Sequence, residues 1–125
     1  MSILEKIQLI LVKKRPYLIF YMHNPSEAVQ MEVVKQDPWL IRYINNPIEK
    51  VQLMAVKHNL ELFYFIKNPT EKVQIEAVNK NPYIIMWIQS PTEKVQLEVV
   101  RRSPKAIIYI QNPSDAVLEY VKNLK

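Results

Sequence analysis

The sequence predicts an all-α fold, namely an α-solenoid of five and a half two-helix repeats of 22 residues each. Prolines recur at that spacing, and most repeats carry two helix-start signals. No segment shows the alternation of apolar and polar residues, bounded by turns, that is typical of a strand. A repeat this short cannot bury its own apolar face, so neighbouring repeats must stack. We therefore expect a single repeat domain over residues 1–125.

The boundaries of the repeats follow from their prolines. Five prolines lie 22 residues apart, each preceded by Asn or Ser: Pro25, Pro47, Pro69, Pro91 and Pro113. Extending the same frame backwards places Ile3 in register with them. The predicted repeats are therefore 2–23, 24–45, 46–67, 68–89 and 90–111, followed by a terminal cap at 112–125.

Each repeat begins with a start signal for a longer first helix. In Asn68-Pro69-Thr70-Glu71 the pattern predicts Asn as the N-cap, Pro at the first helical position and the acid at the third. The acid recurs in every repeat, and capping explains it better than a metal site or a catalytic carboxylate pair does. The helix ends in basic or amide residues such as Arg101, which suit the negative end of the helix dipole.

A shorter second helix begins 13 residues after the first proline position in four repeats, at Pro16, Pro38, Pro82 and Pro104. It has about seven residues and is apolar nearly all round, and such a helix is normally buried on every side. A two-layer solenoid has no third layer to cover it. Either these helices lie unusually deep, or a strip of them stays exposed as a binding surface.

Composition excludes several classes of function. The chain has no Gly and no Cys, so it lacks phosphate-cradling loops, strained nucleophile turns, disulfides and thiolate metal sites. His23 and His58 are isolated, and no nucleophile lies in a pattern with a base. We predict a non-enzymatic protein with no metal and no cofactor. Because no apolar run approaches the roughly 20 residues of a membrane span, we expect no membrane partner and a cytoplasmic location.

Two complete repeats carry a resemblance to a known family. Residues 68–89 (NPTEKVQIEAVNKNPYIIMWIQ) and 90–111 (SPTEKVQLEVVRRSPKAIIYIQ) resemble the leucine-rich variant repeat, although the period here is shorter. The resemblance implies an α-helix alternating with a short 3₁₀ helix, stacked into a superhelix. The chain is also similar to helical repeat proteins of unknown function from bacteria, phages and large viruses, and this resemblance implies a gene carried by a phage or another mobile element.

Aromatic residues of the second helices are the leading candidates for contacting a protein partner. An aromatic residue recurs at the 22-residue step in all five of these helices, including Tyr43 and Phe65. This column would form either an aromatic-lined groove or the packing between stacked repeats. The third repeat also has apolar residues where other repeats have polar ones, which suggests a hot spot. The predicted partner-binding residues are Tyr43, Phe63, Tyr64, Phe65, Met86 and Trp87.

Basic residues mark the ends of the first helices, and the chain carries a net charge of +5. A stripe of them would contact phosphates or an acidic partner, so nucleic-acid binding is the alternative function. Interaction with helix dipoles would explain the same residues without any ligand. The candidate residues are Lys57, Lys80, Arg101 and Arg102.

Two further features leave alternatives open. A glutamine recurs within the apolar arc of the first helix, at Gln8, Gln30, Gln52, Gln74 and Gln96; it would either tie neighbouring repeats together or contact a ligand. The first helix carries Leu4 and Ile10, although terminal repeats normally turn a polar face outward. This apolar N-terminal helix suggests a homodimer or a docking partner.

Overall fold

The structure is a computed structural model that describes residues 1–124, and the secondary structure over this range is helical, with no strand. The chain divides into two compact units, Met1–Pro69 and Thr70–Lys125. The division comes directly after Pro69, near the start of the fourth predicted repeat.

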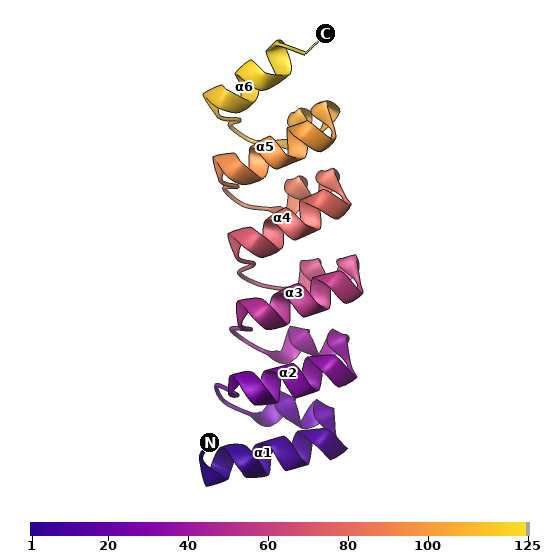
Figure 1. Ribbon diagram of the computed structural model, residues 1–125, viewed down its shortest axis with the longest axis vertical. Coiled ribbons are helices and arrows are strands. Elements are labelled where there is room, and N and C mark those ends of the chain that lie inside the picture. Colours follow the sequence, from indigo (N-terminus) through magenta and orange to yellow (C-terminus); the bar gives the residue numbers. More distant parts are fainter. Residues whose placement is uncertain (125) are drawn as a thin grey trace. The chain divides into compact units, whose positions relative to one another are not determined.

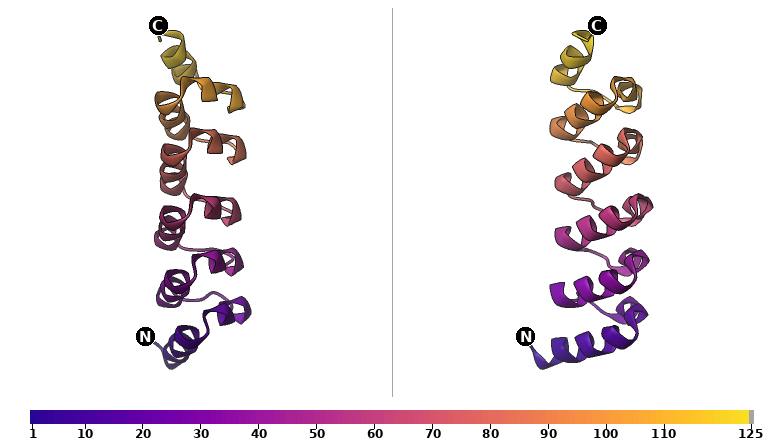
Figure 2. Two further views of the ribbon diagram at one scale, coloured as in Figure 1. Left: turned by 90° about the vertical axis from the view of Figure 1, so that its right-hand side faces the viewer. Right: turned by 45° about the vertical axis from the view of Figure 1, so that its right-hand side comes forward.

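Unit 1 contains three α-helices, and each is followed by a six-residue 3₁₀ helix (Figure 1). Within this unit the α-helices form one layer and the 3₁₀ helices a second layer beside it (Figure 2, left). Helix α2 packs against α1 and α3, while η2 packs against η1 and η3. The elements are α1 (Ile3–Lys14), η1 (Pro16–Tyr21), α2 (Glu27–Gln36), η2 (Pro38–Tyr43), α3 (Glu49–His58) and η3 (Leu60–Phe65).

Unit 2 repeats the same alternation. Helix α5 packs against α4 and α6, and η4 packs against η5. The elements are α4 (Glu71–Lys80), η4 (Pro82–Trp87), α5 (Glu93–Arg102), η5 (Pro104–Tyr109) and α6 (Asp115–Lys122). The prediction of an all-helical chain in which neighbouring helices pack is therefore confirmed.

The second helices are 3₁₀ helices of six residues, and in η2, η3 and η4 the side chain of the preceding residue caps the start. Asp37 Oδ1 accepts a hydrogen bond from the Trp39 backbone N–H at 3.1 Å, directly at the predicted proline start. Where the proline is replaced by Leu60, Asn59 Oδ1 accepts from the Glu61 N–H at 3.0 Å and the same element forms. The i→i+3 hydrogen bonds of a 3₁₀ helix have poorer geometry than those of an α-helix, which is why such helices stay short.

The N-cap prediction was wrong by two positions in the repeats that begin with proline. The cap is the residue after the proline: the Ser26 hydroxyl accepts from the Val29 N–H at 3.3 Å, and Glu27 is the first helical residue. Asn24 instead has φ of 47°, in the left-handed region that Asn tolerates, and ends the preceding segment. The acid still lies in the first turn, where the helix dipole favours it. In α1 the N-cap is Ser2, as predicted.

One N-cap is defective, and its repair should stabilise the protein. Ile48 caps α3 but has no side-chain hydrogen bond to the first turn. Ile48→Ser should raise the free energy of unfolding by about 0.5–1 kcal/mol, because Ser supplies the missing acceptor. The mirror substitution, Ser26→Ala, should lower it by about 1 kcal/mol. Urea titrations of the three proteins would check both values; a loss of stability in Ile48→Ser would contradict the role of the cap.

The core lies between the two layers of each unit. Helices α2 and α3 contribute valines and an alanine that are 0% exposed, and the 3₁₀ helices contribute aliphatic residues such as Ile41, which is 1% exposed. Residues of both layers that are at most 1% exposed are Val29, Val33, Val51, Ala55, Ile19 and Leu62 in unit 1, and Val73, Ala77, Val95, Val99, Ile84 and Ile85 in unit 2.

The buried glutamines tie one repeat to the next. Gln30 donates from Nε2 to the Pro25 carbonyl at 2.9 Å and accepts at Oε1 from the Ile48 N–H at 3.0 Å. In unit 2, Gln96 bridges the Pro91 carbonyl and the Ser114 N–H at 3.0 and 2.9 Å. The interpretation as a structural ladder is thus confirmed for these two residues, since both amide groups are engaged by backbone.

Candidate partner-binding surface

The 3₁₀ helices expose large apolar side chains on the side that faces away from the α-helices. We call Phe20, Tyr21, Tyr43, Tyr64 and Phe65 the aromatic strip of unit 1. Their exposed fractions run from 37% at Tyr43 to 73% at Tyr21. In unit 2 the equivalent positions are Met86, Trp87, Ile108 and Tyr109, which we call the apolar patch of unit 2; they are 39–76% exposed.

The rings of these surfaces are held by edge-to-face packing between successive repeats. The ring centroids lie 5.2 Å apart for Phe20 and Tyr43, and 5.7 Å apart for Trp39 and Phe65. In unit 2, the rings of Tyr83 and Tyr109 meet in the same way at 5.5 Å. The aromatic column therefore packs between repeats and remains exposed at the same time. Rings fixed in this way lose little side-chain entropy when a partner binds.

A cation accompanies the strip at one point. The guanidinium carbon of Arg42 lies 4.8 Å from the centre of the Tyr43 ring. This is within the range of a cation–π interaction, and it leaves a planar positive group at the surface.

Five of the six predicted partner-binding residues are exposed, and one is not. Tyr43, Tyr64 and Phe65 belong to the aromatic strip of unit 1, whereas Met86 and Trp87 belong to the apolar patch of unit 2. Phe63 is only 3% exposed, so the prediction that it contacts a partner was wrong. Its position in the repeat is that of Ile41 and Ile85, which are core residues. Phe63 enlarges the core and offers no contact surface.

Four exposed residues of these surfaces were missing from the predicted set. Ile108 and Tyr109 lie one repeat after Met86 and Trp87, and Phe20 and Tyr21 lie one repeat before Arg42 and Tyr43. The 22-residue period contained this signal, because it extends the same two columns to the first and last 3₁₀ helices.

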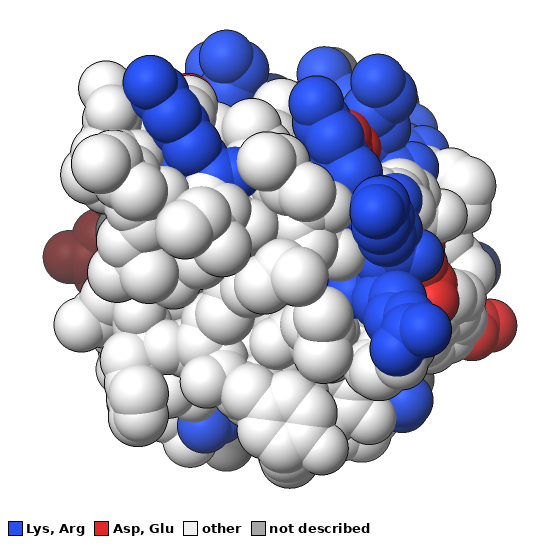
Figure 3. Space-filling view, turned by 90° about the horizontal axis from the view of Figure 1, so that it is seen from below, with Lys and Arg blue, Asp and Glu red and all other residues white. Residues whose placement is uncertain are grey.

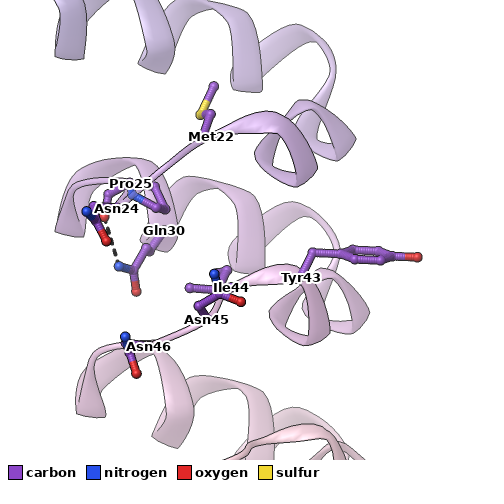
Figure 4. Close-up of a pocket in the computed structure, with 8 residues that line it drawn as sticks. All are labelled: Met22, Asn24, Pro25, Gln30, Tyr43, Ile44, Asn45 and Asn46. Atoms are coloured by element: carbon purple, nitrogen blue, oxygen red, sulfur yellow. Dashed lines mark hydrogen bonds between the residues drawn. The ribbon is translucent and has the colours of Figure 1, made fainter.

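A cleft lies where the segment after one 3₁₀ helix meets the next repeat. In unit 1 it has a volume of about 230 Å³. Figure 4 shows Gln30 reaching back to Pro25 on one side, with the Tyr43 side chain extending outward on the other. Its lining residues are Met22, Asn24, Pro25, Gln30, Tyr43, Ile44, Asn45 and Asn46.

Unit 2 has a cleft at the corresponding repeat positions, with a volume of about 440 Å³. Ile88, Ser90, Pro91 and Tyr109 occupy the places that Met22, Asn24, Pro25 and Tyr43 take in unit 1, and Trp87 and Met86 add to the wall. Both clefts combine an aromatic ring with side-chain amides, Asn45 and Asn46 in one and Gln89, Gln111 and Asn112 in the other. The repeat thus makes the same kind of recess in each unit.

The basic candidates are exposed at the ends of their helices. Lys57 lies in the last turn of α3 in unit 1, while Lys80, Arg101 and Arg102 lie in the last turns of α4 and α5 in unit 2. These positions fit favourable interaction with the helix dipoles as well as contact with an anionic ligand.

Over residues 1–124 no group of three or more His, Cys, Asp or Glu side chains could hold a metal ion. In the same range, every helix is too short or too polar to cross a bilayer. No family model, curated protein or solved structure matches the chain.

Proposed function

We propose that this protein is an α-solenoid of five and a half repeats that acts as a non-enzymatic protein-interaction module, an adaptor or inhibitor. The partner-binding surfaces are the aromatic strip of unit 1 and the apolar patch of unit 2, each in the 3₁₀ layer of its own unit. The observation that carries the proposal is the exposure of large rings there, up to 73% at Tyr21 and 63% at Trp87. Large apolar side chains exposed side by side, as Phe20 and Tyr43 are in unit 1, are typical of interaction sites.

The composition of the strip supports a protein ligand. Interface hot spots are enriched in Tyr, Trp and Arg, and all three occur in or beside these surfaces, at Tyr64, Trp87 and Arg42. The clefts add side-chain amides such as Asn46 and Gln111 next to the rings. Amides both donate to and accept from a peptide backbone. A peptide segment with apolar side chains in the clefts is therefore the ligand class that this surface fits.

A second candidate function is nucleic-acid binding, favoured by exposed Arg101 and Arg102 and by the Arg42–Tyr43 pair. In that case the arginines would contact phosphates and the rings would stack on bases. Each of the six α-helices described, α1 to α6, has an acid in its first turn, and these acids dilute the positive field. The salt dependence of the affinity separates the two functions. Binding to phosphates releases counterions, so the affinity for nucleic acid falls as salt rises, whereas apolar contacts release no counterions.

The test is affinity capture from nuclease-treated lysate at low and high salt, with three versions of the chain. We expect a discrete protein to be retained at high salt by the wild type and by Arg101→Ser/Arg102→Ser. With Tyr64→Ser/Phe65→Ser, the amount of this protein that is retained should fall at least tenfold, because two central rings of the strip are removed. Circular dichroism of each variant checks that the fold is intact.

A parallel titration follows the fluorescence anisotropy of a labelled 20-nucleotide single strand. Binding of this strand that falls steeply with salt and is lost in Arg101→Ser/Arg102→Ser would replace the first function with the second. A protein retained equally by all three versions would show that the aromatic strip is not the binding surface.

A further inference from the structure

The corner between α5 and η5 in unit 2 concentrates positive charge. Arg101 and Arg102 end α5, Lys105 is the second residue of η5, and all three side chains are exposed. We call these three residues the basic corner of unit 2. The segment 99–114 around it contains no acid. Among residues 1–124, no acid forms an ion pair with any of the three, so the described chain does not neutralise this charge.

The repeat pattern does not dictate this corner, because unit 1 has acids at two of the same positions. In the repeat frame, Asp37 corresponds to Ser103 and Glu61 corresponds to Lys105. Figure 3 views the molecule from the α1 end and shows Lys and Arg along one border, with Asp and Glu side chains among them. Helix dipoles do not dictate the corner either, since Lys105 lies in the first turn of η5, where a dipole disfavours a cation.

The basic corner is continuous with the apolar patch of unit 2. Ser103 directly follows Arg102, and its Oγ lies 3.4 Å from the hydroxyl oxygen of Tyr83. The Tyr83 ring in turn meets the Tyr109 ring edge to face, with the centroids 5.5 Å apart. Tyr109 lines the cleft of about 440 Å³ together with Trp87. A single path of contacts therefore leads from the cations to the apolar recess.

We infer that unit 2 binds an acidic peptide segment of the partner protein, with carboxylates of the segment on the basic corner and a large apolar side chain in the cleft. Such a ligand is one form of the protein partner proposed above, and the inference rests on that function. Each arginine of the corner can bind a carboxylate through two parallel N–H donors. In the cleft, the Trp87 and Tyr109 rings can contact the apolar side chain, and amides such as that of Gln111 can bind the peptide backbone.

The length of η5 sets the spacing of these groups in the ligand. At a rise of about 2.0 Å per residue in a 3₁₀ helix, Lys105 and Tyr109 are about 8 Å apart along η5. An extended peptide spans about 3.3 Å per residue, so the nearest acid should lie about two or three residues from the apolar residue. Further acids, which would reach Arg101 and Arg102, should lie beyond the first.

The surface fits a short acidic peptide better than a nucleic acid. A strand of phosphates needs cations repeated along its path, whereas these cations are confined to one corner. Stacked bases need open ring faces. The Tyr83 and Tyr109 rings meet at an interplanar angle of 79°, so the edge of one already covers a face of the other.

Selection from a phage-displayed library of random twelve-residue peptides on the immobilised full chain tests the ligand class without a preset sequence. At physiological salt, we expect the enriched peptides to share acids close to a large apolar residue, at the spacing given above. The same selection on Arg101→Glu/Arg102→Glu should no longer enrich them. Enriched peptides without acids, the same peptides on both chains, or no enrichment would overturn the inference.

A titration then locates an enriched, fluorescently labelled peptide on unit 2. Its affinity, measured by fluorescence anisotropy, should fall at least tenfold in Arg101→Ser/Arg102→Ser. The matched control, Lys72→Ser/Lys94→Ser, removes two exposed cations from the first turns of α4 and α5 in the same unit. A ten-residue α-helix is about 15 Å long, which exceeds the Debye length of about 8 Å at physiological salt, so the control should lower the affinity less than twofold.

Equal losses in the two variants would mean that the peptide responds to net charge alone, and would overturn the inference. Circular dichroism of each variant checks that the fold is intact. Competition with an unlabelled 20-nucleotide single strand tests the other occupant of the corner. We expect the strand to displace the labelled peptide only at higher concentrations than the unlabelled peptide does; the reverse order would assign the basic corner to nucleic acid.

The capture experiment succeeds or fails separately, because it is scored at high salt and on Tyr64 and Phe65 of unit 1. High salt screens the charges of the basic corner, so Arg101→Ser/Arg102→Ser should still retain the partner there. Capture that depends on Tyr64 and Phe65, together with peptides that ignore the basic corner, would refute the acidic ligand and leave the proposed function in place. No captured protein at any salt would refute the proposed function itself.

Discussion

Leu62→Ala is expected to destabilise the protein by about 2–5 kcal/mol, the range for removing a fully buried leucine side chain. Leu62 is 0% exposed and lies in η3, at the junction of the two layers of unit 1. Helix η3 packs against α3 and η2, so the truncation leaves a cavity inside unit 1.

The matched control is Tyr64→Ala, two residues further along the same 3₁₀ helix. Tyr64 is 49% exposed, so its truncation should cost about 1 kcal/mol or less, as is usual at the surface. Urea denaturation followed by circular dichroism measures both. Equal losses would mean that the 3₁₀ layer is not packed as described.

Gln96→Leu should lower the free energy of unfolding by about 2–4 kcal/mol. Gln96 is 6% exposed, and its amide satisfies the Pro91 carbonyl and the Ser114 N–H. Leucine has a similar shape but leaves two backbone groups without partners, and each costs about 1–3 kcal/mol when buried. Because these two groups belong to successive repeats, the loss should appear as early unfolding of α6 in hydrogen exchange.

The reverse change at the same repeat position is the control. Leu118 occupies the glutamine column in α6 and is 47% exposed. Leu118→Gln should change stability by less than about 0.5 kcal/mol, since an exposed side chain makes no comparable bridge. If Gln96→Leu lowered the free energy of unfolding no more than Leu118→Gln does, the claim that the buried glutamines join successive repeats would be wrong.

The helical organisation was predictable because proline spacing and capping residues are local signals. Helix η2 begins at Pro38 after the cap Asp37, and α5 ends at Arg102. Both boundaries lie where the sequence predicts them. The exact cap was not predictable from the Asn-Pro pair, because both Asn and Ser or Thr are good caps. The choice depends on Asn24 adopting a positive φ, which is a property of the folded turn.

The exposed face of the 3₁₀ helices could be predicted only in part from their sequences. Their residues are apolar at nearly every position, so the side that packs is set by where the α-helices lie. Ile41 and Tyr43 show this, since both are apolar in character yet one is 1% and the other 37% exposed. Phe63 was misassigned for this reason: comparison with Ile41 and Ile85 at the same repeat position identifies the core column only once burial is known.

Hydrogen–deuterium exchange of the chain with and without its captured protein partner tests the central claim most directly. We expect slower exchange on binding in the 3₁₀ helices, above all in η2 and η3 beside Tyr43 and Tyr64, with the outer sides of α2 and α5 unchanged. Protection confined to the last turns of α3, α4 and α5, where Lys57, Lys80 and Arg101 lie, would contradict the claim and place the binding surface at the helix ends.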